Sequence, residues 1–294
     1  LPAMASMVLL ATTHHVSQDV APIPFLWVIP LSIYLISFII TFDHPGWYRR
    51  LPFGLAAMAA IYITVGMGNV ESWKSLEWFN DFRAAGGDLD VEPITFDFGY
   101  RGHLAVHFLA LFAICMLCHG ELVRLRPAPR YLTSFYLMIS LGGALGGLFV
   151  SLVAPVAFDT YIEWKLGMAG GFALAALTVF GSFRWRAATP TKIAAVSLGI
   201  VVAAGALLEL CVMFSGEDSE FTEVVERSRN FYGAVKVVKR ENDESGYKNR
   251  SFYHGSIVHG AQLSTPGDEQ FPTTYYTEDG GAGIDSKSSH RSKG

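Results

Sequence analysis

Two cysteines and a histidine stand at the spacing that attaches haem to c-type cytochromes. The residues CMLCH at 115–119 match C-x-x-C-H, in which both thiols form thioethers and the histidine binds iron. That chemistry needs an exposed motif, whereas Cys115 and Cys118 lie within an apolar run. We therefore expect buried thiols on a helix. Cys211 also lies in an apolar run, so no disulfide framework is implied.

Two further histidines share a spacing that suits metal ligands. His103 and His107 are four residues apart, which places them on one helix face. The sequence places no third ligand beside them, so histidines packed in the protein are the expected outcome, and no metal site is predicted.

Two carboxylates lie within or beside apolar runs, where an ionisable group is a functional candidate. Glu209 is close to the end of the last run, and Asp19 follows the first run. Asp19 forms a polar cluster with His14 and His15, which either lines a cavity or belongs to a loop.

The composition separates a membrane part from a polar part. The chain is 51% hydrophobic and 16% charged, against about 25% charge in soluble domains. Residues 1–214 hold 25 charged side chains, and the much shorter stretch 215–294 holds 23. The formal net charge of −4 gives no reason to expect a nucleic-acid partner, and the expected partner is the lipid bilayer.

A spanning helix needs about 20 mostly apolar residues. Seven runs approach that requirement: 1–12 (partial), 25–42, 51–68, 103–119, 131–157, 166–183 and 193–214. The fold class expected is a membrane all-α helical bundle of about six to seven spans, followed by a small domain rich in β-hairpins and a disordered tail. Pro30, inside the second run, is tolerable where neighbours satisfy the carbonyl that it frees.

Four glycines in the fifth run form two overlapping G-x-x-x-G pairs. They are Gly142, Gly143, Gly146 and Gly147. This spacing predicts a helix face on which a neighbouring backbone approaches closely.

Lysine and arginine sort the loops by side of the membrane. Loops 43–50, 120–130 and 184–192 are basic and are predicted to be cytoplasmic. Loop 69–102 holds three basic and seven acidic residues and is predicted to be external, with a surface helix over 73–82. Loops 13–24 and 158–165 belong to the same external set, and this alternation puts the residues after 214 outside as well. A re-entrant run 193–214, or one other run that does not span, would put them on the cytoplasmic side instead.

The polar domain spans 215–284. Residues 223–240 contain a strand rich in aromatic and β-branched residues, residues 241–246 are a turn cluster, and 247–259 alternate as a second strand. The two strands predict a hairpin, with 272–276 as a further short strand or extended segment. The tail 285–294 is short, polar and patternless, and is expected to be disordered.

Three segments of the polar domain look like the N-terminal β-domain of spermidine-synthase-like proteins. They are RNFYG at 229–233, HGSIVHGAQ at 254–262 and PTTYY at 272–276. The membrane part also resembles bacterial inner-membrane proteins in which a multi-spanning region is fused to such a domain. That likeness rests on QDVA at 18–21, PFLW at 24–27, HGELVRLRPAPR at 119–130 and SFYLMISLGGALGGLF at 134–149.

The resemblance implies aminopropyl transfer from decarboxylated S-adenosylmethionine to a small cationic amine. In that superfamily a Rossmann-like domain after the β-domain holds the nucleoside, and this chain resembles a fragment without it, inactive alone. The glycines at 280–283 match the linker to that domain. The resemblance assigns no catalytic residue here. The candidates that it implies for the amine site are Gln262, Tyr275, Tyr276, His254 and His259. The alternative is a membrane transporter or sensor with a non-catalytic β-domain.

Overall fold

The computed structural model describes most of the helical part and the strands. The described residues are 1–19, 26–44, 46–68, 99–182, 197, 199–201, 203–208, 210–211, 222–230, 233–242, 247–255, 257–264, 267–268, 271 and 273. The chain divides into two compact units, Leu1–Glu217 and Asp218–Gly294, and each is described by itself.

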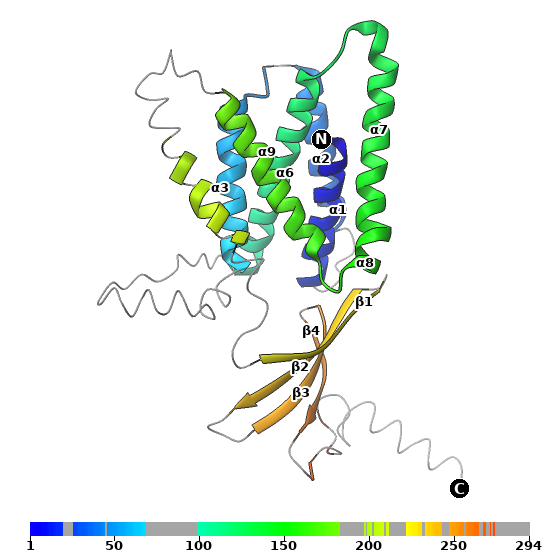
Figure 1. Cartoon of the computed structure of the whole chain (residues 1–294), viewed down its shortest axis with the longest axis vertical. Helices are drawn as coiled ribbons and strands as arrows, with labels where there is room; N and C mark the ends of the chain where they lie inside the picture. The colour runs from blue at the N-terminus through cyan, green and yellow to red at the C-terminus, as the bar shows by residue number, and fades with distance from the viewer. Residues whose placement is uncertain are drawn as a thin grey trace. The chain divides into compact units, whose positions relative to one another are not determined.

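The first unit is a bundle of apolar helices (Figure 1). Its helices are α1 (Pro2–Asp19), α2 (Val28–Asp43), α3 (Arg50–Gly68), α6 (Gly99–Arg124), α7 (Leu132–Leu148), α8 (Ala154–Ala157) and α9 (Ile162–Ser182). A 3-10 turn, Pro129–Tyr131, precedes α7, and a π-helical turn, Phe149–Val153, joins α7 to α8.

Three helical stretches are long and apolar enough to cross a membrane: Arg101–Arg124, Pro129–Ala157 and Ile162–Ser182. The helices Val28–Asp43 and Arg50–Gly66 are apolar but shorter. The chain thus has the apolar helices expected of a membrane-associated protein, and the count of six to seven spans stays a prediction.

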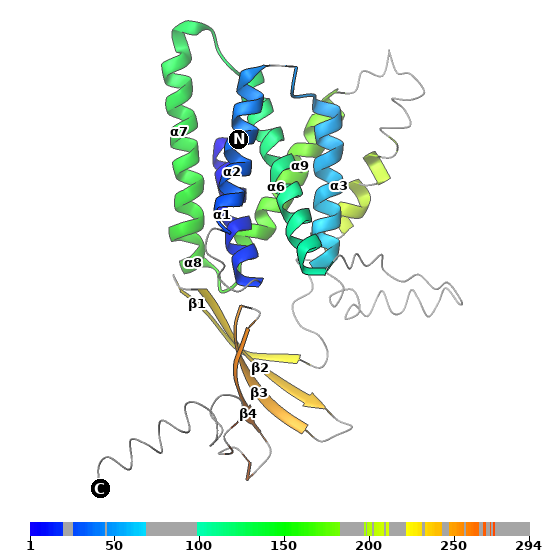
Figure 2. The ribbon, with the colours of Figure 1, turned by 180° about the vertical axis from the view of Figure 1, so that it is seen from behind.

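Helix α6 is the centre of the bundle. It packs against α1, α2, α3 and α9, and its side chains Leu111, Ile114 and Leu117 are fully buried. Figures 1 and 2 show α7 at the edge of this group, beside α1.

The four glycines of α7 all lie against α1. A Cβ at Gly146 would overlap the carbonyl oxygen of Ala3, and one at Gly142 would lie 3.1 Å from Pro2. A Cβ at Gly143 or Gly147 would meet Ser6 or Leu10 at 3.4 Å or 3.7 Å. Side chains at Gly146 and Gly142 would therefore push α7 and α1 apart.

Several predicted helix ends are wrong. The first helix continues to Asp19, so His14 and His15 are helical and do not belong to a loop at 13–24. Helix α6 extends beyond 103–119 at both ends, because Glu121 finds cationic partners that permit a carboxylate near the end of an apolar helix. Pro30 frees no carbonyl, because α2 begins at Val28 and Pro30 lies in its first turn, where the backbone N–H has no helical acceptor.

The second unit is a four-stranded antiparallel meander in the order β1-β2-β3-β4. The strands are β1 (Thr222–Asn230), β2 (Gly233–Asn242), β3 (Tyr247–His254) and β4 (Ile257–Leu263). The predicted hairpin is present as β2 and β3, which pair antiparallel from Val235↔His254 to Asn242↔Tyr247, and β1 and β4 add a strand on each side that the residue pattern did not separate. The chain reverses beside Gly233 and Gly255, whose φ values of 143° and 61° favour glycine.

Several predictions fall outside the described residues. These are the surface helix at 73–82, most of loop 69–102 and of run 193–214, the basic loop 184–192, Tyr275 and Tyr276, the glycines at 280–283, and the tail.

Candidate functional site

Two polar clusters lie at opposite ends of the helical unit. We call Tyr48, Arg50, Glu121 and Arg124 the arginine cluster, and His15, His103, His107 and Trp164 the histidine cluster. Helix α6 contributes to both, through His107 near its beginning and Glu121 near its end. Fourteen residues of helix separate these two positions by about 21 Å.

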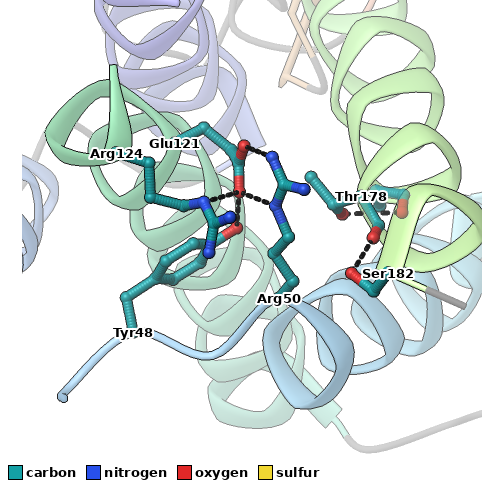
Figure 3. A network of polar contacts seen from close by, with 7 residues as sticks. Tyr48, Arg50, Glu121, Arg124, Thr178 and Ser182 are labelled. Atoms are coloured by element: carbon teal, nitrogen blue, oxygen red, sulfur yellow. Dashed lines mark hydrogen bonds and ion pairs between the residues drawn. The ribbon is translucent and has the colours of Figure 1, made fainter. Parts of the chain in front are cut away.

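The arginine cluster surrounds one carboxylate (Figure 3). The Nε of Arg50 donates to Oε1 of Glu121 at 2.7 Å, and its Nη2 donates to Oε2. The hydroxyl of Tyr48 donates to Oε1 at 2.8 Å, and the Nε of Arg124 lies 3.9 Å from the same oxygen. This bidentate pair with a third donor is the arrangement that holds a partly buried carboxylate ionised.

Local sequence brings these groups together. Tyr48 lies two residues before Arg50, which begins α3, while Glu121 and Arg124 are one helical turn apart on α6. Gly120 is required where the Tyr48 ring packs on α6, because a Cβ there would overlap that ring. Burial, and then the hydrogen bond to the Glu121 carboxylate, raise the pKa of Tyr48 above its ordinary value, so that its phenol stays a donor.

The arginine cluster has a structural role and is not placed for catalysis. Both oxygens of Glu121 are engaged by donors, so the carboxylate is poorly placed to remove a proton from a substrate. Nearby, Thr178 and Ser182 of α9 donate to backbone carbonyls within their own helix. Sequence reasoning missed the cluster. The available signal was a carboxylate one turn before an arginine at the end of an apolar run.

The histidine cluster is a stack of rings from three helices. The ring of His15 on α1 stacks on Trp164 of α9, with centroids 4.2 Å apart. The ring of His107 on α6 lies 5.2 Å from His15 and 5.7 Å from Trp164. His103 lies 6.5 Å from His107, one turn earlier on α6. The structure thus brings His103 and His107 of α6 together with His15 of α1, which the sequence pattern places in a separate polar cluster.

The hydrogen-bond partner of His107 fixes which of its ring nitrogens carries the proton. The Nδ1 of His107 lies 2.8 Å from the carbonyl oxygen of His103. A carbonyl only accepts, so Nδ1 carries the proton and donates it. In a neutral ring Nε2 is then the nitrogen able to accept a proton.

Further buried polar groups lie near the stack. Glu163, in the first turn of α9, is fully buried beside Trp164. The Nε1 of Trp164 and the Oγ1 of Thr12 are buried and have no hydrogen-bond partner among the described residues. Thr12 lies one turn before His15 on α1. Ionisable side chains inside an apolar bundle are candidates for function, whereas the Glu121 carboxylate is fully engaged by its donors.

The described residues form no recognisable metal site, and the haem-attachment motif is buried. Among the described residues no group of three or more histidine, cysteine, aspartate or glutamate side chains is placed to hold a metal ion. Cys115 and Cys118 are buried in α6, as expected. The Nδ1 of His119 lies 3.0 Å from Ser37 Oγ, and its ring is packed edge-on by Tyr34 and Phe38.

The predicted amine-site residues lie on the last two strands where they are described. His254 on β3 and His259 on β4 have ring centroids 5.8 Å apart. Gln262 is exposed on β4, and its cross-strand neighbour is Arg250. His254 also packs on the first turn, where a Cβ at Gly233 would lie 2.5 Å from its Nε2. Asp19 is the last residue of α1, and Glu209 lies outside the described residues.

The strands around these residues are basic. Among strand side chains that the structure describes, Glu226 is the single carboxylate. The cations there are Arg227, Arg229, Lys236, Lys239, Arg240, Lys248 and Arg250. Lys236 and Arg240 lie 5.5 Å and 5.9 Å from the ring centroid of Tyr253. Such a surface repels a cationic amine and attracts an anion.

Comparison with protein-family models, with curated proteins and with solved structures found no match to this chain.

Proposed function

We propose that this chain is the membrane-anchored front part of a spermidine-synthase-like protein and is inactive by itself. The order of its units carries the proposal: apolar helices are followed by an antiparallel meander. Within that meander the HGSIVHGAQ segment, 254–262, supplies the turn at Gly255 and strand β4. The bacterial inner membrane is the location that this proposal implies.

The role proposed for the meander is to form one wall of a site completed by a nucleoside-binding domain. In aminopropyl transfer an amine nitrogen attacks the methylene beside a sulfonium, so carboxylates should hold the amine and a base should take its proton. His254, His259 and Gln262 offer imidazole and amide groups in place of carboxylates. Together with the basic strands, they favour a substrate with an anionic or neutral group in place of a simple diamine.

The test compares this chain with the complete gene product that carries it. Radiolabelled decarboxylated S-adenosylmethionine is equilibrated with each protein in nanodiscs. We expect the complete product to bind the nucleoside and this chain to bind none. Absence of binding by the complete product contradicts the proposal, and so does binding by this chain that survives truncation at residue 217.

The histidine cluster favours a second candidate, a proton-coupled transporter with a non-catalytic β unit. Three imidazoles lie together inside an apolar bundle, where ionisable groups are costly and mark ion pathways. The protein is reconstituted into vesicles that enclose a pH-sensitive dye, and a membrane potential is imposed. Proton uptake should fall in His107→Gln and persist in His44→Gln, which alters an exposed histidine on a connector. Absence of uptake by the unaltered protein rejects this candidate.

A further inference from the structure

The arginine cluster joins two connectors at one end of the bundle. Tyr48 and Arg50 end the connector from α2 to α3, and Glu121 lies one turn before the connector from α6 to α7. Figures 1 and 2 show both connectors at the same end of the helices. The contacts with Glu121 therefore hold exposed residues of two segments, 43–50 and 121–131, on one surface.

That surface carries an excess of positive charge. Its two segments hold five arginines: Arg49, Arg50, Arg124, Arg126 and Arg130. Against them stand two carboxylates, Glu121 and Asp43. Glu121 is shared by Arg50 and Arg124, so one guanidinium charge of that cluster remains uncompensated even within the network.

Exposed aromatic and aliphatic side chains accompany the arginines. Trp47 is 60% exposed, Leu125 is 66% exposed and Tyr131 is 51% exposed. The guanidinium of Arg130 lies over the ring of Tyr131, 4.6 Å from its centroid. Tryptophan and tyrosine of this kind gather where the hydrocarbon meets the headgroups of a bilayer.

We infer that this surface, made of Trp47, Arg49, Leu125, Arg126, Arg130 and Tyr131, binds the headgroups of anionic phospholipids. The arginines bind the lipid phosphates, while the apolar side chains enter the boundary between headgroups and acyl chains. A free phosphate ion has no acyl chains and could engage the arginines alone. Glu121 acts indirectly, because it aligns the two connectors. The inference rests on the membrane anchoring proposed above.

The test counts lipids that stay bound. The full chain is reconstituted into nanodiscs of equal parts phosphatidylcholine and phosphatidylglycerol, released into mild detergent, and weighed by native mass spectrometry. We expect phosphatidylglycerol to be enriched at least about fivefold among retained lipids, the order associated with one arginine at a membrane surface. Enrichment should fall in high salt and should not fall when millimolar inorganic phosphate is added.

A matched pair of variants locates the effect. The triple variant R49Q/R126Q/R130Q alters exposed arginines that make no contact with Glu121 in the structure, so the bundle should fold normally. The control K236Q/R240Q/R250Q removes the same charge from exposed strand positions. Enrichment should be lost in the first and kept in the second. Equal retention of both lipids, unchanged enrichment in the first variant, or loss in the control overturns the inference. A chain that fails to enter nanodiscs instead rejects the proposed anchoring.

Discussion

The two ends of the helical bundle treat buried polar groups in opposite ways. At one end, the single carboxylate of Glu121 is held by three donors from two elements. At the other, rings of His15, His107 and Trp164 stack, while Thr12 Oγ1 and Trp164 Nε1 have no hydrogen-bond partner among the described residues. A buried carboxylate whose hydrogen bonds are all made stabilises the bundle. Buried donors and acceptors without a partner lower its stability, and such groups are often explained by a functional role.

The largest difference is expected on removing the shared carboxylate. Glu121→Ala leaves Arg50 without its bidentate partner and should lower the free energy of unfolding by about 3 kcal/mol. Thermal unfolding in detergent measures the loss. Asp43→Ala, an exposed acid at the same end, should change little. If Arg50→Met/Glu121→Leu does not recover part of the loss, the pair contributes more than its geometry indicates.

Gly120 offers a steric test of the arginine cluster. Gly120→Ala places a methyl group in the ring of Tyr48 and should cost about 1–3 kcal/mol through overpacking. The control is Gly181→Ala near the end of α9, where a Cβ meets nothing within 4 Å and the substitution should be neutral or stabilising. Equal unfolding temperatures for the two variants would show that Tyr48 is not held against α6.

Tyr48→Phe removes one donor and should cost about 1.5 kcal/mol below pH 10. The pKa of Tyr48 is raised in the folded protein, first by burial and then by the Glu121 carboxylate. This contribution is therefore complete below the unfolded value near 10 and is lost as pH rises towards the folded value. Unfolding temperatures of the two proteins should converge above about pH 10. A constant difference across that range contradicts the pKa direction.

The smallest change in stability is expected at the histidine end, where a substitution should stabilise the protein. Thr12→Val replaces a buried hydroxyl without a partner by a methyl group of the same shape, and should stabilise the protein by about 1 kcal/mol. Thr64→Val is the control, because the Thr64 hydroxyl donates to the carbonyl of Ala60 at 2.7 Å. A loss of stability in Thr12→Val would indicate that a bound water or ligand completes this end.

The apolar helices could be predicted because burial and membrane crossing both require long apolar runs. Their ends could not, since the ends depend on partners distant in sequence. Glu121 extends α6 past the predicted limit through Arg50, which lies 71 residues earlier. His15 was predicted to line a cavity or to lie in a loop, whereas α1 continues past it and its ring stacks on Trp164 of the neighbouring helix α9.

For the strands, residue types predicted where β structure lies but not where one strand ends and the next begins. Residue types identified β structure over 223–240 and 247–259, but they did not place the reversals beside Gly233 and Gly255. A glycine inside an apparent strand is either a weak strand position or a turn, and pairing with neighbours decides which. Likewise, the candidate residues His254, His259 and Gln262 could be named from a resemblance, while the basic strands around them appeared only with the register.

The helical column of Pro129–Ala157 has 29 residues. At 1.5 Å per residue the column is about 43 Å long and exceeds a hydrocarbon core of about 30 Å. Hydrophobic mismatch of this size is relieved by tilting the column or by local thickening of the bilayer. Because Gly146 packs against the backbone of Ala3 in α1, a tilt of the column would be transmitted to the bundle, and we expect the packing of the bundle to respond to bilayer thickness.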